Sequence, residues 1–187
     1  MTTFFAVLDV STLAFLYVLF SELLAPSELL WANNEFELKV KTEIKDYFLN
    51  QKNIVLEAKN EIVNKQSKQY FENMLATNLK IMKAEKSSYE IVKKQAKETG
   101  DFDVLSRVDI DIIALGYQCK GTIITDDFAI QNIALALNIK FLSCSGKIIS
   151  EKRIWRYRCT ACGHIEKIKL KNCSVCGNEE IRRVKLK

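Results

Sequence analysis

The stretch from Thr122 to Ala136 reads TIITDDFAIQNIALA, and it contains the patterns from which the fold class can be predicted. Its first three residues are β-branched and predict a short buried strand. The spacing of the apolar residues that follow predicts a helix: Phe128, Ile130, Ile133, Ala134 and Leu137. Two carboxylates, Asp126 and Asp127, therefore stand at the carboxyl end of the predicted strand, where open α/β sheets bind ligands. Because helix N-caps are the commoner role for such residues, the stretch alone favours a cap over a metal ligand.

Strand and helix patterns alternate along the rest of the chain as far as Leu142, which predicts an α/β fold with a parallel sheet. The apolar run Phe4–Leu8 predicts a buried strand, and Asp9 follows it directly. Two capping boxes, Ser87 with Glu90 and Ser106 with Asp109, mark the starts of two helices. Gly100 is a natural helix stop. The remaining strands are expected at 79–82 and 140–142, and helices at 11–24, 37–49, 53–76, 87–99 and from 107 onward.

Charge is unevenly distributed along the 187 residues. Residues 152–187 hold 11 Lys and Arg against 3 Asp and Glu, whereas residues 1–151 hold 17 against 20. The basic C-terminal part has the charge expected of a segment that binds a polyanion. We therefore expect two units, a domain of residues 1–152 and a small module of residues 153–187.

The composition gives no indication of a secreted or membrane protein. The start of the chain lacks the basic segment of a signal peptide. The largely apolar run of residues 10–21 is shorter than the ~20 residues that span a bilayer. With 48% hydrophobic residues the chain can build a core. We expect a soluble, cytoplasmic protein with no membrane partner.

Four of the six cysteines form two C-x-x-C pairs, each followed by glycine and separated from one another by ten residues. This spacing is a strong signal for zinc, with Cys159, Cys162, Cys173 and Cys176 as ligands. Two such knuckles with strands between them predict a zinc ribbon. The zinc is expected to be structural, because four protein ligands leave no open position. A module of this size cannot build its own core, so metal binding supplies its folding free energy.

Basic and aromatic residues alternate just before the first cysteine. Arg156 and Arg158 alternate with Trp155 and Tyr157, Arg153 precedes them, and Arg182 and Arg183 lie near the end of the chain. On a strand this pattern gives an aromatic face and a basic face. Two interpretations stand equally: the aromatic residues pack the ribbon against the first domain, or all seven residues bind single-stranded RNA by base stacking and phosphate contacts.

Acidic residues recur at places that can converge on one edge of the sheet. They are Asp9 after the first strand, Glu43 on a helix, Asp109 in the first turn of another helix, and Asp126 and Asp127 after a later strand. Several carboxylates without basic partners repel one another and raise each other's pKa values. Hard divalent cations relieve this repulsion, and oxygen ligands select Mg²⁺ or Mn²⁺. Such a site can clamp a phosphodiester during in-line displacement by water.

Three segments of the chain resemble one known family. They are KETGDFDVLSRVDIDIIALG at 97–116, IITDDFAIQN at 123–132 and WRYRCTACG at 155–163. Together they are similar to the Nin-one-binding (Nob) endonucleases, which are PIN-domain ribonucleases. The resemblance implies a PIN-like parallel sheet flanked by helices, plus a small C-terminal zinc ribbon. Where this family usually has Thr before the third acid, this chain has Val108.

The resemblance also implies a function. Asp9, Glu43, Asp109 and Asp127 would be the acidic residues that bind Mn²⁺ or Mg²⁺, with Asp126 adjoining and Asp101 supporting the site. The substrate would be precursor small-subunit ribosomal RNA, within the pre-ribosomal small subunit and cut at its mature 3′ end. Two alternatives stay open at this point: a toxin-type PIN ribonuclease, in which a zinc ribbon is not expected, and a non-catalytic RNA-binding assembly factor.

Overall fold

The computed structural model describes residues 79–143 and 145–186, the short segments 6–8 and 53–55, and the single residues Lys65, Gln69 and Glu72. The predictions for Asp9, Glu43 and the helices at 11–24 and 37–49 lie outside the described residues. Helical structure at Lys65, Gln69 and Glu72 agrees with the helix predicted there. None of the helices in the described part of the chain is long and apolar enough to cross a membrane.

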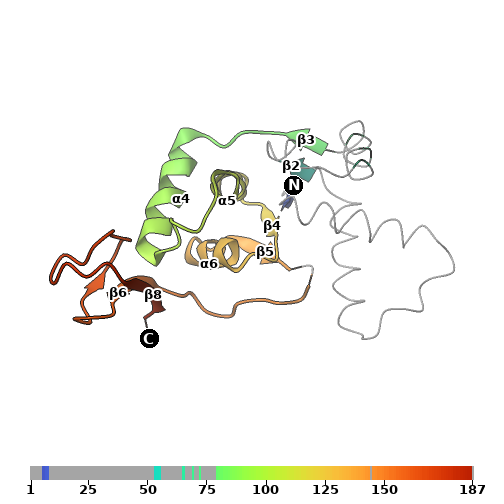
Figure 1. Ribbon diagram of the computed structural model, residues 1–187. Helices are drawn as coiled ribbons and strands as arrows, with labels where there is room; N and C mark the ends of the chain where they lie inside the picture. Colours follow the sequence, from blue (N-terminus) through green and yellow to red (C-terminus); the bar gives the residue numbers. More distant parts are fainter. Residues whose placement is uncertain are drawn as a thin grey trace.

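Five short strands form one parallel sheet in the order β3-β2-β1-β4-β5 (Figure 1). They are β1 (Ala6–Leu8), β2 (Asn53–Val55), β3 (Leu79–Ile81), β4 (Thr122–Ile124) and β5 (Lys140–Leu142). All four pairings are parallel. The three residues of β4 are buried, as expected for a strand covered on both faces. The parallel sheet predicted from the alternating pattern is confirmed.

One strand was not expected from the sequence. The pattern assigns residues 53–55 to the start of a helix, and that prediction is wrong, because they form β2 between β1 and β3. The sequence pattern misleads here because Ile54 and Val55 have the same helical spacing relative to Ile62 and Val63 as residues on one helix face. The β-branched pair Ile54 and Val55 suits a strand, and pairing with both neighbours supplies the hydrogen bonds of the ladder.

Three helices build the core with the sheet: α4 (Lys86–Thr99), α5 (Arg107–Cys119) and α6 (Phe128–Ala136). α5 packs on β1 and β4, α6 packs on β5, and α4 packs on both helices from outside (Figure 1). The fully buried residues at the centre are mainly isoleucines of α5, β4 and α6: Ile112, Ile113, Ile123, Ile130 and Ile133. Phe128, which the sequence places in the apolar stripe of α6, is instead 46% exposed.

The two predicted capping boxes have different outcomes. Ser106 caps α5: Asp109 N–H donates to Ser106 Oγ at 3.2 Å, and Ser106 N–H donates to Asp109 Oδ2 at 2.7 Å. The box at Ser87 and Glu90 is wrong, because α4 begins one residue before Ser87. Its N-cap residue, Glu85, makes no side-chain cap, and the Glu85 N–H donates to Gln118 Oε1 of α5 at 2.6 Å. Gln118 thus accepts a hydrogen bond from the N-cap residue's own N–H, the group that Glu90 would bind if Ser87 were the N-cap.

The C-terminal module is a three-stranded antiparallel sheet in the order β7-β6-β8. Its strands are β6 (Trp155–Cys159), β7 (Ile165–Glu166) and β8 (Ile181–Lys185). Cys159 ends β6, Cys162 lies between β6 and β7, and Cys173 and Cys176 lie between β7 and β8, which confirms the predicted ribbon. The ribbon contacts the end of α4 directly, and that contact depends on the glycine at which α4 ends.

Replacing Gly100 tests this contact. Gly100 has φ +80°, and a Cβ added to it would lie 2.3 Å from the Trp155 carbonyl oxygen. Gly177 is the matched control, because it has φ +77° and an added Cβ would meet nothing within 4 Å. We expect Gly177→Ala to lower the free energy of unfolding by about 1–2 kcal/mol through backbone strain. Gly100→Ala should cost a further ~1–3 kcal/mol, because the ribbon must shift. Urea unfolding of the zinc-loaded variants measures both, and equal losses would show that the contact does not hold the ribbon.

Candidate active site and zinc centre

Asp127 lies at the carboxyl end of β4 and caps α6. Its Oδ1 accepts a hydrogen bond from Ala129 N–H at 2.6 Å, and its own N–H donates to Thr125 Oγ1 at 3.1 Å. The cap interpretation of this carboxylate is therefore confirmed. The cap occupies one carboxylate oxygen, and no hydrogen bond or ion pair to the other, Oδ2, is found within the described part of the chain. Capping and metal ligation are thus compatible at this residue.

Asp126 ties the ends of two neighbouring strands together. Its Oδ1 accepts hydrogen bonds from Ser143 Oγ at 2.6 Å and from Ser145 N–H and Oγ at 3.1 Å each. Ser143 follows β5 directly, so these bonds fix the segment after β5 against the segment after β4. The Asp126 side chain is exposed at this edge.

Asp109 lies at the same end of the sheet as these two residues. α5 leads through a short turn into β4, so it runs opposite to the strand and its first turn lies at the carboxyl end of β4. The half-buried Asp109 carboxylate uses Oδ2 for the capping box. In the part of the chain that the structure describes, these three acids do not form a three-ligand metal cluster by themselves. The predicted convergence involves Asp9 and Glu43 as well, so it stays a prediction.

Two buried amides extend the motif that begins with Asp126 and Asp127. Gln131 Nε2 donates to the carbonyls of Thr125 and Lys147 at 3.1 Å each, and its Oε1 accepts from Ile149 N–H at 3.1 Å. Asn132 binds the backbone of Arg153 in the same way. Its Oδ1 accepts from the Arg153 N–H at 2.7 Å, and its Nδ2 donates to the Arg153 carbonyl at 2.8 Å. Neither residue was predicted to have a role, although two adjacent polar residues in an otherwise apolar helix were a visible signal.

Asp101 connects the helices to the ribbon. It is 1% exposed, and its two carboxylate oxygens accept from Arg183 at 2.7 Å and from Asn132 Nδ2 at 2.6 Å. The implied support of the acidic site is therefore indirect at most, because both oxygens are engaged by the contact with the ribbon. The Arg183 guanidinium also lies over the Trp155 ring, 4.3 Å from its centroid.

The aromatic residues of β6, Trp155 and Tyr157, take part in the contact between the ribbon and the helices. Tyr157 is buried, and its hydroxyl group donates a hydrogen bond to Asp103 Oδ2 at 2.8 Å. Burial, followed by this hydrogen bond, raises the pKa of Tyr157 to about 12. Arg156 donates to the Glu98 carbonyl at 3.1 Å. The packing interpretation thus accounts for Trp155, Tyr157 and part of the basic set.

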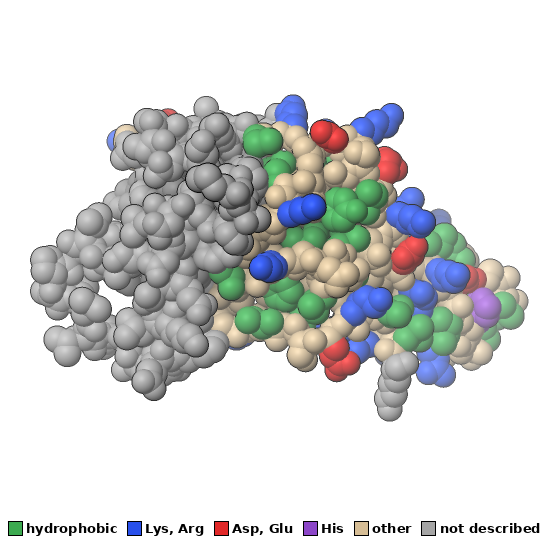
Figure 2. Space-filling view, turned by 180° about the vertical axis from the view of Figure 1, so that it is seen from behind, with side chains coloured by type: hydrophobic (Ala, Val, Ile, Leu, Met, Phe, Trp, Pro, Cys, Tyr) green, Lys and Arg blue, Asp and Glu red, His purple; other side chains and the backbone are tan. Residues whose placement is uncertain are grey.

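Other basic side chains remain at the surface. Arg158 and Arg182 are exposed, and Arg182 pairs with Glu180 at 2.6 Å. Figure 2 shows Lys and Arg side chains spread over the described part of one face, at the ribbon and beyond it, with fewer Asp and Glu. RNA contacts by Arg153, Arg158 and Arg182 stay a prediction.

The four predicted zinc ligands converge. The Sγ atoms of Cys159, Cys162, Cys173 and Cys176 all lie within 4.8 Å of one another. Backbone N–H groups, first that of Cys162, lower the pKa of Cys159 to about 6. The backbone N–H of His164 lowers the pKa of Cys162, but hydrogen bonds with Cys176 and the other cysteines outweigh it and raise that pKa to about 12. Four thiols this close cannot all ionise without a cation, and a tetrahedral Zn²⁺ fits the set.

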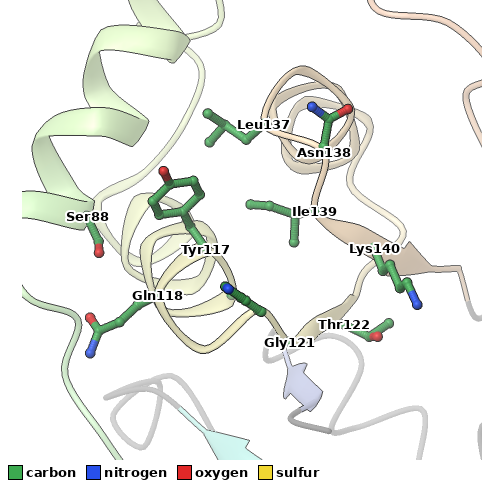
Figure 3. Close-up of a pocket in the computed structure, with 11 residues that line it drawn as sticks. Ser88, Tyr117, Gln118, Gly121, Thr122, Leu137, Asn138, Ile139 and Lys140 are labelled. Carbon is green, nitrogen blue, oxygen red and sulfur yellow. The ribbon is translucent and has the colours of Figure 1, made fainter. Parts of the chain in front are cut away.

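A separate cavity of about 610 Å³ opens at the other end of the sheet (Figure 3). Its walls come from the segments that lead into β4 and β5, including Tyr117, Gln118, Thr122, Asn138 and Lys140. These are the amino ends of the strands, whereas Asp126 and Asp127 follow a carboxyl end. The cavity is therefore distinct from the candidate acidic site.

Comparison with known proteins places these features in context. Residues 39–119 match the model of a family described as the PIN domain of ribonuclease. The chain is 39% identical over 131 residues to Endoribonuclease Nob1 of Archaeoglobus fulgidus, covering 67% of this chain and 76% of that protein. It is 30% identical over 106 residues to Endoribonuclease Nob1 of Pyrococcus abyssi, covering 55% and 64%. It is 36% identical over 117 residues to Ribonuclease VapC1 of Thermoplasma acidophilum, covering 63% of this chain but only 60% of that relative.

Proposed function

The chain belongs to the Nob1 family of PIN-domain proteins, and from this premise we propose that it is a metal-dependent endoribonuclease. The proposed substrate is precursor small-subunit ribosomal RNA, cut in the cytoplasm at its mature 3′ end while part of the pre-ribosomal small subunit. The observation that carries the proposal is the position of Asp109, Asp126 and Asp127 at one end of β4, on this fold. The proposed units are a nuclease domain of residues 1–152 and a zinc ribbon of residues 153–187.

The proposed metal ligands are Asp9, Glu43, Asp109 and Asp127, with Asp126 beside them. Carboxylate oxygens suit Mg²⁺ or Mn²⁺, and within the described residues neither Asp109 nor Asp127 forms an ion pair with Lys or Arg. When bound, such an ion supplies charge stabilisation and water activation for in-line attack on a phosphodiester, which leaves a 5′-phosphate and a 3′-hydroxyl.

Hydrogen bonds within the chain hold the candidate carboxylates in fixed orientations. Ala129 N–H holds one oxygen of Asp127, and Ser106 N–H holds one oxygen of Asp109. Each carboxylate is thereby oriented before any ligand arrives, with its second oxygen available for a metal. Orientation of this kind lowers the reorganisation needed during the reaction. The serines on Asp126 fix the neighbouring edge of the site in the same way.

The ribbon supports an RNA substrate in this proposal. The Asp101–Arg183 ion pair and the Tyr157–Asp103 hydrogen bond hold it against the nuclease domain. Exposed Arg158 and Arg182 could then contact phosphates at a constant distance from the acids. Zinc is proposed to be structural and to hold this surface in shape.

The test is cleavage of an RNA that spans the mature 3′ end, compared with an unrelated single-stranded RNA of equal length. We expect the zinc-loaded chain to cut the first RNA internally in the presence of Mn²⁺ or Mg²⁺, and to stop when the divalent ion is omitted. Equal cutting of both RNAs would favour the toxin-type alternative, which the similarity to Ribonuclease VapC1 keeps open. Zinc-dependent RNA binding without any cleavage would favour a non-catalytic assembly factor.

A further inference from the structure

An exposed aromatic ring lies next to the candidate acidic site. Phe128 is the first residue of α6 and directly follows Asp127. It is 46% exposed, whereas Ile130 and Ile133 of the same helix are at most 1% exposed. Leaving a large aromatic side chain in water forgoes the free energy of burying it. A ring exposed in this position is suited to contact with a ligand.

A cation is held close to this ring. The Arg153 guanidinium carbon lies 6.0 Å from the centroid of the Phe128 ring, within the range of a cation–π contact. Arg153 comes from the segment before β6, far from Phe128 in the sequence. Asn132, one helical turn after Phe128, binds both the N–H and the carbonyl of Arg153. α6 therefore positions the ring and the cation together.

Asn132 is itself held from the other side. Its Nδ2 also donates to the buried carboxylate of Asp101, which pairs with Arg183 of the ribbon. The backbone of Arg153 is thus restrained by a hydrogen-bonded network that includes both units of the chain. The hydrogen bonds to the Arg153 backbone therefore keep its guanidinium close to the Phe128 ring, so the two side chains form one surface.

We propose that Phe128 and Arg153 form a subsite for one unpaired nucleobase and its adjacent phosphate, immediately beside Asp127. The base stacks on the exposed Phe128 ring, and the guanidinium contacts the phosphate. The inference rests on the proposed function, because it places a nucleotide next to the acids that would cleave the strand. It also explains why Phe128 keeps a large ring at the surface although the other apolar residues of α6 are buried or half-buried.

The test is the affinity of the zinc-loaded chain for a short single-stranded RNA, measured by fluorescence anisotropy in buffer without Mn²⁺ or Mg²⁺. Phe128→Ala should weaken binding roughly 5- to 150-fold, the range that corresponds to about 1–3 kcal/mol per stacked base. Phe128→Tyr should keep the affinity, whereas Phe128→Leu should lose it as Ala does, because Leu is apolar but has no ring face. Arg153→Gln should weaken binding and reduce the log–log salt slope by roughly 0.7.

Ile91→Ala is the matched control, since Ile91 is 39% exposed on α4 and should not affect RNA binding. Full affinity of Phe128→Leu or of Phe128→Ala would overturn the subsite. An equal loss of affinity for a blunt RNA duplex would also overturn it, because a paired base cannot stack on the ring. If the stacking pattern holds but no RNA is cleaved with Mn²⁺, the subsite stands and the proposed nuclease function fails.

Discussion

Replacing Asp127 by Asn is expected to reduce the rate of RNA cleavage by roughly 10²–10³-fold while leaving the fold intact. Asn is as good an N-cap as Asp, so its side-chain oxygen can still accept from Ala129 N–H. The substitution therefore removes the negative charge but keeps the hydrogen bond. The loss of rate corresponds to a few kcal/mol of stabilisation of the transition state.

Single-turnover cleavage and thermal unfolding should be measured on the same preparations. Glu151→Gln is a suitable control, because Glu151 is an exposed carboxylate away from the candidate acids in sequence and should not change the rate. Asp127→Ala should lose the same activity and also about 1 kcal/mol of stability, because Ala cannot cap the helix. A variant Asp127→Asn that cleaves at the rate of the parent chain would remove Asp127 from the site.

Loss of zinc is expected to unfold the ribbon and to destabilise the nuclease domain with it. Zinc binding to a small four-ligand module contributes about 10–16 kcal/mol at neutral pH, more than a module of this size gains from its own core. Arg183 lies on β8, so unfolding of the ribbon removes the cation that pairs with buried Asp101. Breaking such a pair leaves a buried charge without its partner, which is costly.

Cys162→Ser tests this dependence without a chelator. We expect loss of bound zinc by metal analysis, a change in Trp155 fluorescence, and a lower midpoint of thermal unfolding. Cys119→Ser is the matched control, because this half-buried thiol lies outside the four-cysteine cluster. It should retain one zinc per chain. If both variants bind zinc equally, the four cysteines do not form the metal site.

Most of the sheet and the zinc ligands followed from local patterns. Apolar runs predicted β1, β3, β4 and β5, and two C-x-x-C pairs predicted the cysteine cluster, because each signal is complete within a few adjacent residues. β2 did not follow, because Ile54 and Val55 also fit the helical spacing of the apolar residues after them, such as Ile62 and Val63. The capping box predicted at Ser106 is correct. The one predicted at Ser87 is wrong, because α4 begins earlier and the N–H of its N-cap residue, Glu85, donates to Gln118 of another helix.

The features that join the units were harder to predict because they depend on contacts distant in sequence. Asp101 and Arg183 are 82 residues apart, and no local pattern links them. The alternating residues of β6 left packing and RNA binding equally open, and the hydrogen bond from Tyr157 to Asp103 favours packing for that face. Phe128 matched the apolar period of α6, but the period alone could not show that the first turn of the helix projects beyond the core.

Mn²⁺ binding to the zinc-loaded chain, followed by electron paramagnetic resonance, tests whether the acidic residues form a metal site. The parent chain is expected to bind Mn²⁺ at the carboxylate site, and Asp127→Asn should weaken that binding by at least about tenfold while zinc content stays constant. Glu151→Gln should bind Mn²⁺ as the parent chain does. Equal Mn²⁺ affinity in the parent chain and in Asp127→Asn would contradict the assignment of a metal-dependent nuclease site to these acids.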